Sequence, residues 1–385
     1  METGVGAMFS FQTAGEIRFG RGVAGEAASR AMGFGRRVLL VHGATAARAE
    51  WLAEALRDAG AEVAGFACGR EPDVALIEAG VAAARNHGAQ VVVSLGGGAV
   101  IDAGKAIAAL VPATRSMLDH LEVVGQGAPL EADPLPFIAL PTTAGTGAEV
   151  TKNAVIGVPE AGRKVSLRDA RMLADLALVD PGLTDGLPKA VTLASGLDAV
   201  TQVIEPYVSS KANRLTDALC RAVIAPGLRA LRYLVDEGED KAARDELAWC
   251  SLSGGLALAN AGLGAVHGLA GPIGGVSPAP HGAVCGRLLP FVLEENARRA
   301  EGVTAARLGE VRGWIAEALG GDPDEAPATL EAWALAAGLP GLQAMGLTPA
   351  QFGAVAEAAV GSSSMKGNPV ELDVECLVQI LQRAG

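Results

Sequence analysis

Two glycine-rich segments of this sequence have the residue types needed to bind a phosphate group. In the first, Gly96-Gly97-Gly98 directly follows the predicted strand 91–95 and precedes a helical pattern that starts near Val100. Glycine lets the backbone approach an anion closely, and the free N–H groups at a helix start face it. Asp102 falls in the first turn, where a carboxylate caps the helix or accepts a hydrogen bond. Taken alone, the triplet is equally consistent with a tight turn, and it is not the GxGxxG pattern of Rossmann domains.

The second segment, PTTAGTGAE at 141–149, also follows a predicted strand. Its hydroxyl groups on Thr142, Thr143 and Thr146 can donate hydrogen bonds to phosphate, ribose or amide groups. A role in capping or turn formation explains one of these threonines more easily than all three. Two such loops at the carboxyl ends of parallel strands lie on the edge where open α/β sheets bind their ligands.

The second half of the sequence offers a small set of possible metal ligands. Asp198 and Gln202 are four residues apart in a helical pattern and therefore project from the same face. His267 and His281 flank an apolar, glycine-rich stretch. The alternative for each histidine is a hydrogen-bonded structural role. The five cysteines form no Cys-x-x-Cys pair and have no adjacent base in the sequence, so we interpret them as core residues.

The elements that must position these residues change character along the chain. Short β-rich runs alternate with helical patterns up to about residue 180, which predicts a parallel sheet covered by helices on both faces. The predicted strands are 37–41, 63–68, 91–95 and 137–140, and the helices between them are 45–59, 74–87 and 100–110. Long helical patterns then dominate, at 188–207, 213–234, 241–261 and 371–383. We predict an α/β domain over 1–184 and an all-α domain over 185–385.

Length and charge restrict the class of protein. A chain of 385 residues is long enough for two domains. The net charge of −12 disfavours binding to nucleic acid or to an anionic membrane. Apolar runs stop well before the ~20 residues of a membrane span, and the N-terminus lacks the pattern of a secretory signal. Together with the unpaired cysteines, this predicts a reduced, cytoplasmic setting.

Several motifs, in this order along the chain, resemble those of the iron-containing alcohol dehydrogenase family. They are FGRG at 19–22, the glycine triplet with Asp102 and Lys105, PTTAGTGAEVT at 141–151, LVDPG at 178–182, GLDA at 196–199, IEPYVS at 204–209, PHG at 280–282 and Asn368-Pro369. The family includes maleylacetate reductases and is distantly similar to dehydroquinate synthase. The resemblance implies a dehydroquinate synthase-like architecture, in which a Rossmann-like dinucleotide domain precedes a helical metal and substrate domain, and a homodimer.

The resemblance also implies hydride transfer between NAD or NADP and a small alcohol or carbonyl compound, with the site between the domains. The implied cofactor-binding residues are Gly97, Gly98, Asp102, Thr142, Thr143, Thr146, Asn153 and Lys164. The implied ligands of Fe²⁺ or Zn²⁺ are Asp198, Gln202, His267 and His281. The metal acts as a Lewis acid on the substrate oxygen.

Three positions depart from the family pattern. Gln202 stands where the second metal ligand is usually histidine, and an amide oxygen is a weak ligand. Gly271 stands where many relatives have a histidine. Gly43 stands where the family often has an aspartate that holds the adenosine ribose, so NADP fits as well as NAD.

These departures keep alternatives open. One is a metal-independent reduction of an acidic keto or enone substrate, as in maleylacetate reductase. In that case His267 and His281 would be the catalytic donors to the developing alkoxide, and Gln202 would orient the substrate. Further alternatives are a nucleotide-binding protein that has lost its activity and, more weakly, a dehydroquinate synthase-like lyase.

Overall fold

The first part of the chain forms a parallel six-stranded sheet in the computed structural model, which describes residues 8–385. In spatial order the strands are β1 (Glu16–Phe19), β8 (Leu176–Val179), β5 (Phe137–Pro141), β4 (Val91–Gly96), β2 (Arg37–His42) and β3 (Glu62–Ala67). The four strands predicted from the sequence are confirmed. The two others, β1 and β8, are only four residues long and pair with each other.

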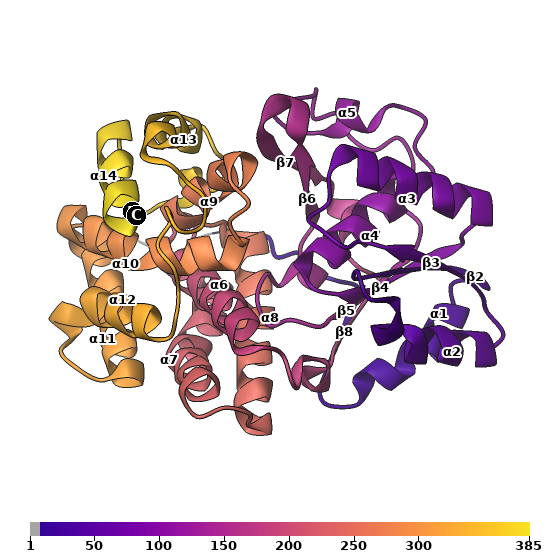
Figure 1. Ribbon diagram of the computed structural model, residues 1–385, viewed down its shortest axis with the longest axis horizontal. Coiled ribbons are helices and arrows are strands. Elements are labelled where there is room, and N and C mark those ends of the chain that lie inside the picture. Colours follow the sequence, from indigo (N-terminus) through magenta and orange to yellow (C-terminus); the bar gives the residue numbers. More distant parts are fainter. Residues whose placement is uncertain (1–7) are drawn as a thin grey trace. The chain divides into compact units, whose positions relative to one another are not determined.

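Helices cover both faces of this sheet (Figure 1). On one face, α1 (Ala27–Met32) and α2 (Glu50–Asp58) pack with alternate strand residues such as Val38 and Leu40. On the other lie α3 (Val74–His87) and α4 (Gly98–Leu110). A Cβ at Gly104 of α4 would lie 1.9 Å from the Ser94 hydroxyl, so only glycine allows α4 to approach β4 this closely.

Three details differ from the prediction. The predicted helix 45–59 is divided into a short 3-10 turn (Ala46–Arg48) and α2, and a short helix, α5 (Met117–His120), also forms. An antiparallel hairpin of β6 (Asn153–Val158) and β7 (Arg163–Arg168) follows the second glycine-rich loop and was not predicted. Gly162, at φ 57°, provides the left-handed backbone conformation of the turn that joins these two strands.

The remainder of the chain is helical, as predicted. Its helices are α6 (Lys189–Val208), α7 (Arg214–Asp236), α8 (Lys241–Ala261), α9 (Ala265–Val276), α10 (His281–Arg299), α11 (Gly302–Leu319), α12 (Ala326–Ala336), α13 (Phe352–Val360) and α14 (Val374–Ala384). The second half of α6 is buried on every side, which is typical of a central core helix. It packs against α7, α8 and α10.

Contacts divide the described residues into two compact units. One unit contains 12–143 and 148–184, and the other contains 8–11, 144–147 and 185–385. The short segment 144–147 of the second glycine-rich loop therefore belongs to the helical unit. Within residues 8–385, no single helix combines the length and hydropathy needed to span a membrane, and α8 and α9 pass that test only as a pair across a 97° bend.

Candidate functional site

One face of α6 carries three buried polar side chains. Asp198, Gln202 and Glu205 are spaced i, i+4 and i+7, which places them on the same side of the helix. They are only 2–4% exposed. Burial of polar groups is unfavourable unless they have partners, so this face must be matched by polar groups from other helices.

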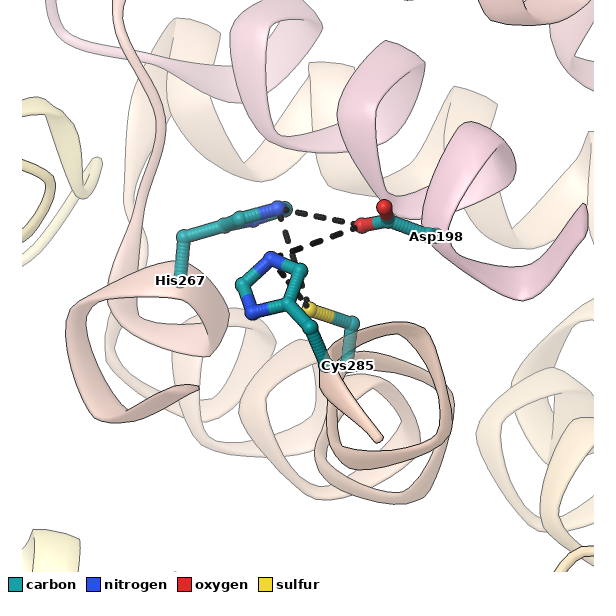
Figure 2. A group of neighbouring side chains, drawn as sticks. Asp198, His267 and Cys285 are labelled. Atoms are coloured by element: carbon teal, nitrogen blue, oxygen red, sulfur yellow. Dashed lines mark hydrogen bonds and ion pairs between the residues drawn. The ribbon is translucent and has the colours of Figure 1, made fainter. Parts of the chain in front are cut away.

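The matching groups come from the starts of α9 and α10. His267 lies in the first turn of α9, His281 is the first residue of α10, and Cys285 follows one turn later. One ligand atom from each of these three residues and one from Asp198 all lie within 4.8 Å of one another. Figure 2 shows Asp198, His267 and Cys285 turned toward a common point.

The distances between these atoms are short. His267 Nε2 lies 3.3 Å from Asp198 Oδ1 and 3.7 Å from Cys285 Sγ. His281 Nε2 lies 3.9 Å from Asp198 Oδ1 and 3.7 Å from Cys285 Sγ. Asp198 Oδ1 is nevertheless buried without a hydrogen-bond partner among the described residues. A carboxylate oxygen, two imidazoles and a sulfur around one point have the composition of a transition-metal site.

Glu205 fixes the orientation of His267. Its Oε2 lies 2.6 Å from His267 Nδ1, and its Oε1 accepts a hydrogen bond of 2.7 Å from the Val266 backbone N–H. Because a carboxylate accepts the Nδ1 proton, the lone pair of the neutral ring is on Nε2, which faces Asp198. This is the arrangement of a metal-binding histidine.

The charges of the cluster depend on one another. The negative charge of Cys285 raises the pKa of His281 to about 9. Burial acts against protonation of His267, but Cys285 and Glu205 outweigh it and raise its pKa well above the ordinary value. Burial likewise opposes ionisation of Asp198, yet the two histidines keep the pKa of this carboxyl below its usual value. Without a metal, the cluster therefore attracts protons to its imidazoles.

Gln202 is buried next to this cluster, but its amide nitrogen is already used. The Nε2 group donates a hydrogen bond of 2.9 Å to the Gly145 carbonyl, in segment 144–147. Gly271, the other departure in this unit, lies in α9, and a Cβ there would meet no atom within 4 Å. Packing therefore does not prevent a side chain at Gly271.

Two parts of the predicted phosphate site meet in the α/β unit. The Thr142 backbone N–H donates to the Gly96 carbonyl at 3.0 Å, and a Cβ at Gly97 would lie 3.3 Å from the Thr143 hydroxyl oxygen. Gly98 begins α4, and no side chain among the described residues caps this helix start. Backbone N–H groups and a threonine hydroxyl thus share one end of α4, which suits an anion.

The other predicted cofactor residues have different contacts. Asp102 accepts a hydrogen bond of 3.0 Å from the Val155 backbone N–H, which ties α4 to β6. Asn153 begins β6, and its side-chain amide lies 3.5 Å from the Ser166 hydroxyl. Lys164 lies on β7 and forms an ion pair with Glu71. Thr146 belongs to the helical unit with Gly145.

Lys105 and Glu149 are two buried charged groups beside the second glycine-rich loop. The Lys105 ammonium donates to carbonyl oxygens of Ala148, Thr151 and Asn153 and lies 3.3 Å from Asp102 Oδ1. Burial lowers the pKa of Lys105. Burial also raises the pKa of Glu149 from 4.5 to about 7, although the positive charge of Lys105 opposes this.

The raised pKa of Glu149 predicts a pH-dependent stability. Between pH 4.5 and about 7 the unfolded chain releases this proton while the folded chain keeps it, so the group destabilises the fold increasingly as pH rises. The difference between 4.5 and about 7 corresponds to about 3 kcal/mol. We expect Glu149→Gln to be more stable than the wild type above pH 7 by up to that amount, and equal to it near pH 4.5. Urea unfolding across this range measures the difference, with the exposed Glu54→Gln as control. If the free energy of unfolding depends on pH in the same way for Glu149→Gln and Glu54→Gln, the prediction is contradicted.

The hydrogen bond between Glu205 and His267 predicts a second effect. Glu205→Gln keeps the shape but removes the charge that holds the Nδ1 proton. Loss of such an outer partner lowers metal affinity by roughly 10–100-fold. Isothermal titration of the metal-free chain with Zn²⁺ measures this, and Glu317→Gln, at the exposed ion pair with Arg229, serves as the control. Equal affinity in both variants would exclude a role of Glu205 in metal binding.

The sequence interpretation missed two members of the cluster. Cys285 is a buried core residue, as predicted, but its sulfur also lies 3.7 Å from both His267 and His281 Nε2, which the sequence interpretation did not anticipate. The spacing of four residues from His281 carried the signal. Glu205 was only part of a quoted motif, although seven residues separate it from Asp198 on the same helix face. Asp198, His267 and His281 do come together, as the resemblance implies.

Comparison with known proteins covers nearly the whole chain. The family model described as iron-containing alcohol dehydrogenase matches residues 14–181, and the one described as Fe-containing alcohol dehydrogenase family, C-terminal, matches residues 192–385. The chain is 35% identical over 314 residues to the probable alcohol dehydrogenase EutG of Escherichia coli K12, over 82% of this chain and 78% of that protein. It is 33% identical to the lactaldehyde reductase of the same strain, over 81% of each chain.

Solved structures share the fold. A 1,3-propanediol oxidoreductase superposes with a TM-score of 0.88 at 28% identity, over 98% of this chain and 100% of that one. The sulfoacetaldehyde reductase from Bifidobacterium kashiwanohense, solved in complex with NAD⁺, gives a TM-score of 0.85 at 25% identity, over 98% of each chain. The arrangement of a parallel sheet followed by a helical region is therefore that of these proteins.

Proposed function

The chain belongs to the iron-containing alcohol dehydrogenase family, and we propose that it transfers a hydride between NAD or NADP and a small alcohol, aldehyde or ketone. In this proposal a divalent ion, Fe²⁺ or Zn²⁺, supplies Lewis-acid polarisation of the substrate oxygen when bound. Relatives named as alcohol dehydrogenases and as a lactaldehyde reductase support the substrate class.

The observation that carries the metal-dependent form is the cluster around Asp198. Its buried Oδ1 lacks a hydrogen-bond partner among the described residues, and His267 and His281 face it. A cation satisfies that oxygen and removes the need to protonate the imidazoles. The residues present therefore fit the ion that the family implies.

The protein's own groups have defined tasks in this proposal. Asp198 supplies a negative charge that offsets the cation, and Glu205 keeps the proton of His267 on Nδ1. Gln202 holds the Gly145 carbonyl and so orders segment 144–147. At the start of α4, Gly97 and Gly98 leave space for the cofactor phosphates, with the Thr143 hydroxyl beside them.

The cofactor is NAD or NADP in this proposal. A relative solved with NAD⁺ supports the nicotinamide nucleotide. Gly43 lies directly after β2 and offers no carboxylate to repel a 2′-phosphate, so NADP is included. A homodimer and a cytoplasmic location stay predictions.

Metal content and turnover test the proposal together. The chain is purified anaerobically without chelator, offered iron and zinc, and analysed for metal per chain. Reduction of a panel of small aldehydes and ketones is then followed with NADH and with NADPH, before and after treatment with a chelator. We expect close to one metal ion per chain and turnover that falls on chelation. Turnover without metal would overturn the metal-dependent form in favour of a metal-independent reductase. Binding of the cofactor without turnover of any compound in the panel would overturn the proposal that the chain is an enzyme.

A further inference from the structure

We propose that Cys285 is a ligand of the metal ion and takes the place in the ligand set that Gln202 was predicted to fill. The inference rests on the proposed function, because it assumes that the cluster holds a divalent cation. The centre would then consist of Asp198, His267, His281 and Cys285. It would retain four protein ligands, with sulfur in place of the usual third imidazole.

The distances within the cluster match a tetrahedral centre that includes sulfur. Bonds of about 2.0–2.1 Å to nitrogen and oxygen and about 2.3 Å to sulfur place tetrahedral ligand atoms about 3.3–3.6 Å apart. The measured separations are 3.3 and 3.9 Å from Asp198 Oδ1 to the two imidazoles, and 3.7 Å from Cys285 Sγ to each of them. These four separations exceed the tetrahedral values by at most a few tenths of an ångström, and all four ligand atoms already lie within 4.8 Å of one another.

The position of Cys285 on α10 explains why its sulfur reaches the site. It follows His281 by four residues, so both side chains project from the first turns of the helix on the same face. Cys285 is fully buried, and Figure 2 shows its sulfur turned toward His267. Elsewhere, Cys68 lies near the carbonyl oxygens of Arg70 and Ala99, which suits a structural thiol.

Gln202 is a weaker candidate for the same role. Its amide nitrogen holds the Gly145 carbonyl at 2.9 Å, and a neutral amide oxygen adds no charge to the site. A thiolate does add charge. With Asp198 and Cys285 ionised and both imidazoles neutral, two negative charges balance a divalent cation, which favours burial of the whole centre. The protons that Cys285 and the two imidazoles share in the metal-free cluster leave to solvent as the ion binds.

The sulfur also bears on the identity of the metal. Thiolate is a soft ligand that favours Zn²⁺ and other late transition ions, whereas oxygen and imidazole ligands alone suit Fe²⁺ well. The loss of a histidine at Gln202 and the gain of a thiolate at Cys285 therefore shift the preference of this chain toward zinc.

Cobalt substitution tests the proposal with a readout that is independent of activity. The full-length chain is freed of metal and titrated anaerobically with Co²⁺, and its absorption spectrum is recorded. Coordination by a thiolate produces an intense near-ultraviolet charge-transfer band, whereas visible d–d bands report any tightly bound Co²⁺. The matched variants are Cys285→Ala and Cys250→Ala, since Cys250 is equally buried but packs against Gly227 in α7. Circular dichroism establishes that both variants are folded.

We expect one Co²⁺ per chain, with the charge-transfer band present in the wild type and in Cys250→Ala and absent in Cys285→Ala. Zinc affinity of Cys285→Ala is expected to fall roughly tenfold or more. Tight Co²⁺ binding with d–d bands but no charge-transfer band in the wild type would overturn the role of Cys285 and leave the proposed function intact. Absence of any Co²⁺, Zn²⁺ or Fe²⁺ binding by the wild type would overturn both.

Discussion

Replacing His267 by alanine is expected to remove the metal ion and to lower turnover by roughly 1000-fold or more. The change deletes the Nε2 atom that lies 3.3 Å from Asp198 Oδ1. It also leaves the Glu205 carboxylate buried with the Val266 N–H but without its imidazole partner. Elemental analysis gives the metal per chain, and steady-state reduction of a small aldehyde by NADH or NADPH gives the turnover.

The matched control is His87→Ala. His87 ends α3 in the other unit, is half-exposed, and its Nε2 lies 3.0 Å from the Glu62 carbonyl oxygen. It should keep both metal and turnover. Added imidazole should partly restore metal binding to His267→Ala if the loss comes from a missing ligand and not from unfolding. If His267→Ala retains its metal and its turnover, the cluster is not the metal centre.

The α/β part of the fold follows from local sequence rules. Runs such as 91–95 are apolar except for Ser94 because their strands are buried on both faces, and the glycine triplet marks the end of the strand. The contact between Gly97 and Thr143 could also be expected, because neighbouring parallel strands end at the same edge. The strands β1 and β8 escaped prediction because four residues are too few to establish a pattern.

The sequence predicts the helices of the second unit, but it does not predict which of their side chains come together in a site. Asp198, His267 and His281 were grouped through resemblance, since spacing alone does not bring α6, α9 and α10 together. The role of Cys285 depends on which face of α10 meets α6. Sequence spacing places it beside His281, but only tertiary packing places that face against Asp198.

The hydrogen-bond partner of Gln202 could not be predicted from the sequence either. The sequence identifies it as a weak ligand on the correct helix face, and the structure places its amide against the Gly145 carbonyl. The partner lies 57 residues earlier in the chain, in a loop that helix periodicity does not describe. Glutamine at position 202 is a poor metal ligand but a good hydrogen-bond donor to the Gly145 carbonyl, and only the folded structure shows this second role.

Lys105→Met is expected to lower the free energy of unfolding by about 3–5 kcal/mol, because removing one member of a buried charged network leaves the others unpaired. The ammonium group is almost completely buried and is 2.8 Å from the Ala148 carbonyl oxygen, 2.9 Å from the Thr151 hydroxyl and 2.5 Å from the Asn153 carbonyl oxygen. Methionine fills the volume but provides no donor for any of them.

The same change should weaken the binding of NAD(P)H, which a purely global loss of stability would not do under conditions where the chain stays folded. Lys105 connects α4, whose first turn contains Gly98, with the end of the second glycine-rich loop at Ala148 and with Asn153 just after it. Urea unfolding and titration of NADH fluorescence measure the two effects, and the exposed Lys189→Met is the control. If Lys105→Met is as stable as the wild type, the carbonyl oxygens that Lys105 contacts must accept hydrogen bonds from water instead. If Lys105→Met lowers the free energy of unfolding but leaves the affinity for NADH unchanged, Lys105 contributes to stability only and does not help to form the cofactor site.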